Sequence, residues 1–306
     1  AFANDRLLTK HDASALTVGQ AKLAFTTDSF VIHPLFFPGG DIGELAVTGT
    51  LNDLAMAGAR PLYLSAGFIL EEGLELSVLK RVVDSMGKAA KAAGAALVTG
   101  DTKVVDRGKG DGLYINTAGI GERVFPMEMN PASVHPGDAV ILSGDIGRHG
   151  MAVMAAREGL GLESDLLSDC ANLWPEVELL AKAGVTVHCL RDLTRGGLAS
   201  ALNEIATSAT ATIAVEEKAI PVVPPVASAC ELLGLDPLYV ANEGRFIAFV
   251  PSTEAEKAVK VLSAKSPSPR VIGQVQKGPG RVTLTNTLGI ERLLDLLYGE
   301  PMPRIC

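Results

Sequence analysis

Three prolines divide the sequence into two parts, and this division constrains the fold more than any other feature. Pro126, Pro131 and Pro136 lie within residues 123–137, and proline lacks the backbone N–H that helices and central strands need. The chain of 306 residues is also long for one hydrophobic core. We therefore expect two domains, residues 1–125 and 133–298, followed by a flexible tail at residues 299–306.

Strands and helices are mixed within each part. In the first part the hydrophobic patterns predict strands at 22–27, 63–70, 95–99 and 114–121 and helices at 42–57 and 77–93. In the second part they predict strands at 139–143, 186–190, 245–250, 272–275 and 282–284, and helices at 151–158, 176–183, 198–207, 227–233, 254–263 and 290–297. The alternation is irregular, which favours an α+β fold with mixed sheets over a doubly wound sheet.

Composition excludes several classes of function. The net charge of −8 argues against a nucleic-acid partner. No apolar run approaches the ~20 residues of a membrane span, and no signal-like segment opens the sequence, so we expect no membrane partner and a cytoplasmic location. The four cysteines form no Cys-x-x-Cys pair, which disfavours a cysteine zinc site or a disulfide framework.

The sequence ends in Pro301-Met302-Pro303-Arg304-Ile305-Cys306. Closely spaced prolines favour an extended arm. A thiol on such an arm can accept a group, carry it and present it elsewhere. The alternative is that Cys306 has no role and the arm is frayed.

Four aspartates stand at or near the ends of predicted elements: Asp28, Asp53, Asp101 and Asp192. Singly, each is more often a turn or capping residue than a ligand. Asp53 is the exception, because it lies in an apolar helix, where an unpaired carboxylate is costly. A shared Mg²⁺ would compensate several such carboxylates at once.

A glycine-spaced run at residues 143–150 follows a predicted strand and precedes a predicted helix. Its N–H groups could face a phosphate, although such loops are more often simple connections. The sequence contains neither a Walker-type phosphate loop nor a dinucleotide-binding fingerprint.

Several segments together resemble one family. They are the Thr-Thr-Asp-Ser-Phe run at 26–30, Phe-Phe-Pro-Gly-Gly at 36–40, Asn-Asp-Leu-Ala at 52–55, the runs at 68–74 and 98–105, and Pro-Arg-Ile-Cys at 303–306. From about Thr26 to Cys306 the chain is similar to the HypE family of hydrogenase maturation proteins, within the aminoimidazole-ribonucleotide synthetase-like (PurM-like) superfamily. Members usually carry a glycine-rich segment before the position of Ala1, so we expect residues to precede the sequence given.

The resemblance implies a two-domain α+β fold, a homodimer formed by the N-terminal domains, and a cleft for ATP and Mg²⁺. It implies that a carbamoyltransferase, HypF, loads a carboxamide onto the terminal thiol. ATP-dependent dehydration then gives a thiocyanate, whose cyano group passes to iron on a HypC–HypD complex for the [NiFe] hydrogenase centre.

Matching positions give the implied site residues. Cys306 would be the carrier thiol, and Asp28, Asp53 and Asp101 would be metal and nucleotide ligands, with Thr102 beside them. Glu243 would be the first choice of base and Lys103 the second, with Lys103 also balancing phosphate charge.

Two alternatives stay open. A synthetase or kinase of the same superfamily would act on a free small molecule and tolerate loss of the tail. A non-catalytic docking protein would use the tail as a recognition peptide and need no nucleotide.

Overall fold

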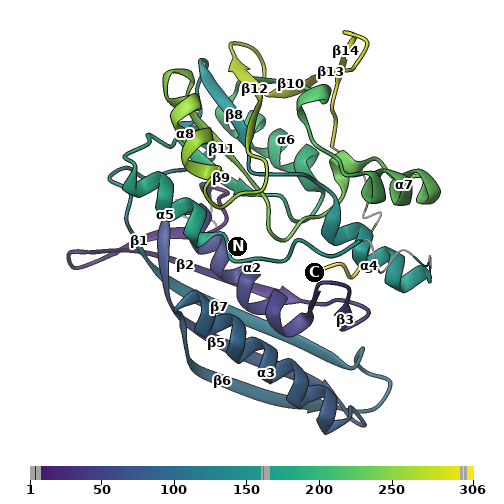
Figure 1. Cartoon of the computed structure of the whole chain (residues 1–306). Helices are drawn as coiled ribbons and strands as arrows, with labels where there is room; N and C mark the ends of the chain where they lie inside the picture. The colour runs from purple at the N-terminus through teal and green to yellow at the C-terminus, as the bar shows by residue number, and fades with distance from the viewer. Residues whose placement is uncertain (1–3, 5–7, 160, 162–165, 297–298, 300–301) are drawn as a thin grey trace.

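The structure is a computed structural model that describes residues 4, 8–159, 161, 166–296, 299 and 302–306. Two sheets form its framework, one from each part of the chain (Figure 1). In Figure 1 the first sheet and its helices occupy the lower half and the second sheet the upper half. The expected α+β organisation with mixed sheets is confirmed.

The first sheet has five strands in the order β1-β2-β7-β5-β6. They are β1 (Ser14–Val18), β2 (Ala21–Phe30), β5 (Ala59–Glu71), β6 (Ala96–Val105) and β7 (Leu113–Arg123). Only β5 and β6 are paired in parallel. A small hairpin, β3 (Phe36–Phe37) and β4 (Gly40–Asp41), leads into the first helix of this part.

Two helices cover one face of this sheet, α2 (Ile42–Met56) and α3 (Leu76–Ala93). The Asp41 side chain accepts the backbone N–H groups of Gly43 and Glu44 at 2.8 and 3.1 Å, which caps α2. A Cβ at Gly43 would lie 2.4 Å from the Val82 carbonyl, so only glycine lets α2 and α3 approach this closely. Helix α2 also contacts β9 and α5 of the second part, and it is buried along nearly its whole length.

The second sheet has seven strands in the order β14-β13-β10-β12-β8-β11-β9. They are β8 (Asp138–Leu142), β9 (Cys189–Asp192), β10 (Thr212–Glu216), β11 (Phe246–Pro251), β12 (Arg270–Gln276), β13 (Arg281–Thr285) and β14 (Glu291–Leu293). All neighbours are antiparallel except β10 and β13.

Hydrophobic clusters lie on both faces of the second sheet. The helices of this part are α4 (Arg148–Glu158), α5 (Trp174–Lys182), α6 (Gly197–Ala209), α7 (Pro224–Leu233) and α8 (Ala255–Leu262). Helix α6 packs into one cluster, and α5 and α8 pack into the other. The central strands β8 and β11 are therefore almost wholly buried. No helix of the described residues is long and apolar enough to span a membrane.

Several elements differ from the sequence-based predictions. The predicted strand at 95–99 continues as β6 through the Gly-Asp-Thr-Lys run, because this run pairs with β5. Strand β10 was not predicted. Residues 290–297 were predicted as a helix, but their described part contains β14, which pairs with β13; pairing with a sheet edge outweighs a short helical pattern.

Candidate active site

A cavity of about 470 Å³ lies where the two parts of the chain meet, and residues distant in sequence line it together. Asp28 comes from β2, Asp53 from α2 and Asp192 from the end of β9. Glu243, in the loop before β11, and Cys306, in the tail, line the same cavity. The structure thus brings together the predicted carrier thiol, two of the three predicted metal ligands and the first-choice base.

Asp12, Asp53 and Asp192 form a compact group of carboxylates, and two of them, Asp53 and Asp192, line this cavity. An oxygen of each lies within 4.8 Å of an oxygen of the others. Thr26 Oγ donates a hydrogen bond to Asp53 Oδ2 at 2.7 Å, and Arg191 pairs with Asp12 at 2.6 Å. Hard divalent cations take oxygen ligands, so this donor set suits Mg²⁺.

Burial and mutual repulsion disturb the titration of this group. Burial raises the pKa of Asp53 well above its ordinary value, and the charges of Asp192 and Asp12 raise it further. Burial likewise raises the pKa of Asp192 to about 8 and that of Asp12 to about 6, although Arg191 opposes both shifts. Several ionised carboxylates share a buried space only at high cost unless a cation joins them. The electrostatics therefore also fit a divalent cation.

Asp28 lies beside this group and lines the cavity. The predicted strand at 22–27 implied that Asp28 follows the strand. Strand β2 instead continues to Phe30, so Asp28 lies within it. Its Oδ1 accepts the N–H of Ser29 at 2.7 Å, and burial raises its pKa. Asp28 thus offers a further oxygen ligand on the open side of the compact group.

Glu243 is buried, with 3% of its surface exposed, and its Oε1 has no hydrogen-bond partner among the described residues. Burial raises its pKa well above the ordinary value, and the charges of Asp192 and Asp169 add to this. Asn52 Nδ2 donates to the Glu243 carbonyl at 3.2 Å, and Asp169 accepts the Glu243 N–H at 3.2 Å. The backbone is thus fixed while the carboxyl group faces the cavity, as a general acid or base requires.

The described part of the tail is docked against the first part of the chain. Ile305 forms an isolated β-bridge with Ile32. The N–H of Val31 donates to the Cys306 carbonyl at 3.0 Å, and that of His33 donates to the Arg304 carbonyl at 3.3 Å. Ile305 is 2% exposed. These contacts place Cys306 in the cavity; the predicted flexibility of the tail stays a prediction.

Two side chains of α4 hold the tail in this position. Arg157 donates to the carbonyls of Pro303 and Arg304 at 2.9 and 2.7 Å. His149 Nε2 donates to the Ile305 carbonyl at 2.8 Å, so its Nδ1 accepts from Ser168 Oγ at 2.9 Å. Neither residue was predicted from the sequence, because its partners are backbone carbonyls about 150 positions away.

Asp101, Thr102 and Lys103 do not line this cavity. They lie on β6, exposed, and Asp101 forms an ion pair with Lys103. Asp101 and Lys103 line a separate surface hollow of about 380 Å³, on the sheet face opposite α2. Three strand spacings, ~14 Å, separate β6 from β2. Within one chain, Asp101 therefore does not join Asp28 and Asp53.

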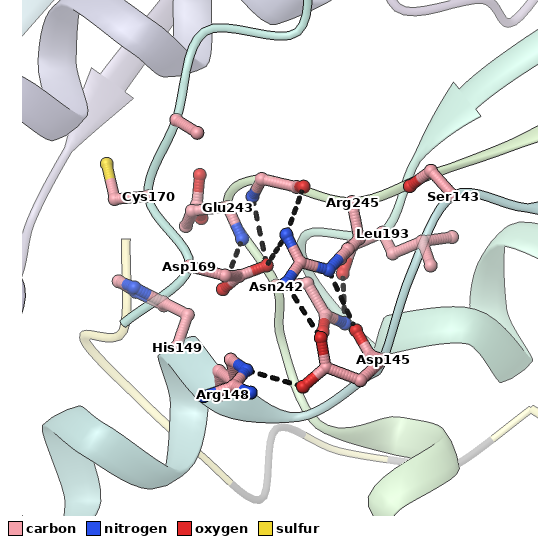
Figure 2. Close-up of polar contacts among 12 residues, drawn as sticks. Ser143, Asp145, Arg148, His149, Asp169, Cys170, Leu193, Asn242, Glu243 and Arg245 are labelled. Carbon is pink, nitrogen blue, oxygen red and sulfur yellow. Dashed lines mark hydrogen bonds and ion pairs between the residues drawn. The ribbon is translucent and has the colours of Figure 1, made fainter. Parts of the chain in front are cut away.

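The glycine-spaced run at 143–150 has a structural role. Gly147 N–H donates to Asn242 Oδ1 at 2.6 Å, and Ile146 N–H donates to the Pro221 carbonyl at 3.0 Å. Asp145 pairs with Arg148 and with Arg245, as Figure 2 shows. These N–H groups are used within the protein, so the run does not offer them to a phosphate.

Known protein families match most of the chain. The family profile "AIR synthase related protein, N-terminal domain" matches residues 10–123, and "AIR synthase related protein, C-terminal domain" matches residues 135–285. The chain is 50% identical to the carbamoyl dehydratase HypE of Rhodobacter capsulatus, over 96% of this chain and 87% of the relative. The chain belongs to the HypE family. The expected aminoimidazole-ribonucleotide synthetase-like fold is confirmed with it.

Solved structures of the HypE family match the whole molecule. A HypE in complex with ATP superposes with a TM-score of 0.91 at 48% identity, covering 100% of this chain and 93% of that one. HypE from a HypE–HypF complex superposes with a TM-score of 0.92 at 43% identity, covering 97% of both chains.

Sequence reasoning missed one member of the carboxylate group and left another unassigned. Asp12 lies in a region of weak periodicity and gave no signal; only its pairing with Arg191 and its distance to Asp53 reveal it. Asp192 was singled out as a strand-end aspartate but received no role. Both residues reach the carboxylate group through long-range packing.

Proposed function

We propose that this chain, like relatives named carbamoyl dehydratase, converts an S-carboxamide on Cys306 to a thiocyanate at the expense of ATP. The observation that carries the proposal is the shared cavity: Cys306, Glu243, Asp53 and Asp28 line one space. This dehydration needs a carrier thiol on the chain, a carboxyl group that acts as acid or base, and carboxylates that bind a cation.

ATP and Mg²⁺ are the proposed co-substrate and metal. A HypE that is 48% identical was solved with ATP. Asp28 and Asp53, together with Asp12 and Asp192, would hold the cation. When bound, Mg²⁺ would neutralise charge on the nucleotide phosphates. Supplying thiocyanate from this site would provide cyanide ligands for hydrogenase iron.

ATP converts the carboxamide oxygen into a phosphate leaving group. The carboxamide oxygen attacks the γ-phosphorus, an O–P bond forms, and the bond to ADP breaks. The phosphate then leaves with the C–O electrons while the C≡N bond forms. Of the two N–H protons, one ends on inorganic phosphate and one in solvent. Glu243 is the proposed base for the amide proton, because it lines the cavity beside Cys306 and burial raises its pKa above the ordinary carboxyl value.

The docked tail contributes in two ways. It ties the reacting group to the site, and a well-oriented tether is worth up to ~7–11 kcal/mol of the barrier. Its buried residues, Met302 and Ile305, also cover the cavity. Covering the cavity limits hydrolysis of the phosphorylated intermediate by water.

A mass measurement on the tail tests the function. A HypF-type carbamoyltransferase first loads a carboxamide onto the full chain. ATP and Mg²⁺ are then added, and mass spectrometry gives the mass of the C-terminal peptide. We expect loss of one water mass from the Cys306 peptide. Cys306→Ala should abolish the product, whereas Cys230→Ala, a thiol on α7, should not. A dehydrated group elsewhere on the chain, or ATP turnover on a free small molecule that survives deletion of 301–306, contradicts the proposal.

HypF and a HypC–HypD complex are the proposed partners. A solved HypE–HypF complex supports HypF, and family resemblance supports HypC–HypD. Both partners must reach the thiol, so the tail must leave the cavity. The contacts that hold it are hydrogen bonds and apolar packing, which can open repeatedly.

A homodimer is proposed from the exposed face of the first sheet. Tyr63, Ile69 and Ile120 project from this face with 50, 44 and 39% of their surface exposed, next to Phe25 at 41%. An apolar sheet face of this kind marks an interface. Asp101, Thr102 and Lys103 lie on the strand at its edge, so their proposed nucleotide role depends on a second copy.

A further inference from the structure

A second group of potential metal ligands lies away from the carboxylate cavity. It consists of His135, Asp138 and His188, and none of the three lines that cavity. His135 and Asp138 belong to one turn at the end of the connection between the two parts, closed by the Asp138 N–H to His135 carbonyl bond of 3.1 Å. Asp138 is the first residue of β8 and His188 precedes β9, so the group joins the end of that connection to two strands of the second sheet.

The distances within the group suit a small coordination sphere. His188 Nδ1 lies 2.8 Å from Asp138 Oδ2, and His135 Nδ1 lies 3.5 Å from Asp138 Oδ1. The two imidazole rings are 4.4 Å apart between centroids. Ligand atoms around a tetrahedral zinc ion lie ~3.3 Å apart, given bonds of ~2.0–2.1 Å. The observed distances bracket this value.

One atom of the group is left without a hydrogen bond. Asp138 is fully buried. Its Oδ2 accepts hydrogen bonds from the His135 N–H at 3.1 Å and from His188, whereas its Oδ1 has no hydrogen-bond partner among the described residues. A buried, unpartnered carboxylate oxygen is costly. Oδ1 is the oxygen nearest the His135 ring, where a cation would satisfy it.

We propose that His135, Asp138 and His188 bind a divalent transition-metal ion of the zinc class, with water completing the tetrahedron. Imidazole nitrogen favours such ions over Mg²⁺ or Ca²⁺. Each histidine binds through its Nδ1, so the His188–Asp138 hydrogen bond is replaced by two bonds to the metal. The ion ties the segment between the two parts to β9 and stabilises the folded chain.

Exposure of the ligands permits entry of the ion. The His135 side chain is 60% exposed and that of His188 12%. Glu254, which accepts the Thr186 N–H at 3.2 Å, adds negative charge near His188. Both the opening and the charge favour capture of a cation from solvent.

Zinc titration of the full chain tests the proposal. All proteins carry Cys306→Ser and are kept in excess Mg²⁺, so that neither the thiol nor the carboxylate group takes up zinc. Calorimetry should show one equivalent of tight Zn²⁺ binding. His135→Asn, at an exposed position, should lose it or weaken it at least tenfold, and the matched control His33→Asn should retain it.

Two further readouts separate binding from folding. Zn²⁺ should raise the melting temperature of the control but not that of His135→Asn, whose metal-free melting temperature should be unchanged. Co²⁺ should give the visible spectrum of a tetrahedral nitrogen–oxygen site only when His135 is present. Equal zinc affinity and stoichiometry in His135→Asn and the control, or no tight equivalent in either, overturns the proposal.

Discussion

At the scale of single residues, chemistry at the site depends on carboxyl groups with raised pKa values. Asp192 and Glu243 are buried, and Asp53 lies half-buried near Asp192. Such an arrangement destabilises a protein unless a ligand uses it. The carboxyl groups differ in their neighbours. Asp53 has two further aspartates within reach of one cation, whereas Glu243 is not a member of that group and its Oε1 has no hydrogen-bond partner among the described residues.

Glu243→Gln should slow the reaction without disturbing the fold. The amide keeps the size of the side chain but cannot accept a proton, so the dehydration rate should fall by about 10²–10⁴. The KM for ATP should change little, because Glu243 is not among the cation ligands. The mass assay on the Cys306 peptide, run over time, gives the rate. Glu231→Gln, on the exposed surface of α7, is the control; an unchanged rate in Glu243→Gln would remove it from the chemistry.

Asp53→Asn should have opposite effects on catalysis and on stability. Loss of one ligand should lower ATP turnover about a hundredfold or more and abolish stabilisation by Mg²⁺–ATP. The metal-free variant should melt at the same or a higher temperature, because one carboxylate of a repelling group is gone. Asp84→Asn, on the surface of α3, is the control. Normal Mg²⁺–ATP stabilisation in Asp53→Asn would show that the cation lies elsewhere.

At the scale of elements, the tail is positioned by strand β2 and helix α4. The segment after β2 supplies the N–H groups of Val31 and His33, and α4 supplies Arg157 and His149. These are separate hydrogen bonds, so docking is an equilibrium that a change at one of them shifts.

Docking of the tail should depend on pH through His149. Burial lowers the pKa of this imidazole, while the Ile305 carbonyl and Asp169 partly oppose the shift. The docked state therefore disfavours the charged ring. The tail is docked most stably above the ordinary pKa of 6.5. As the pH drops below this value, the equilibrium constant for docking falls by at most about tenfold per pH unit.

Hydrogen exchange measures this equilibrium. Protection factors of the Val31 and His33 amides, corrected for intrinsic rates, should fall below pH 6.5. His149→Gln retains an N–H donor but cannot be protonated, so its protection should not vary over the same range. Protection that is independent of pH in the unmodified chain would contradict the role of His149.

At the scale of the whole molecule, the proposed homodimer forms through the open face of the first sheet. Tyr63→Glu places a charge at the centre of this apolar face, where desolvation would be costly. Sedimentation should show a dimer for the unmodified chain and a monomer for Tyr63→Glu. Leu288→Glu, equally apolar and 82% exposed but in the second part, should remain dimeric. Dimers in both variants would place the interface elsewhere.

The sequence determined much of this protein. Helical periodicity marked α2 and α3 within a residue or two of their observed bounds, and the burial problem posed by Asp53 within an apolar helix pointed to its carboxylate group. Motifs that include Asp28 and Cys306 indicated the family, and the resemblance then implied Glu243, so three residues of the cavity were predicted. These signals are local, because they depend on spacing or on residue type within one segment.

The remaining features depend on contacts between segments that are far apart in the sequence. Asp12 joins Asp53 and Asp192 across three separate segments, Asp101 is kept on another strand of the sheet, and the tail is held by carbonyl contacts with α4. The physical reason is common to all three. Burial of a charge and pairing of a backbone group depend on partners far away in sequence. The energies of these interactions therefore contribute only once the two parts of the chain have packed together.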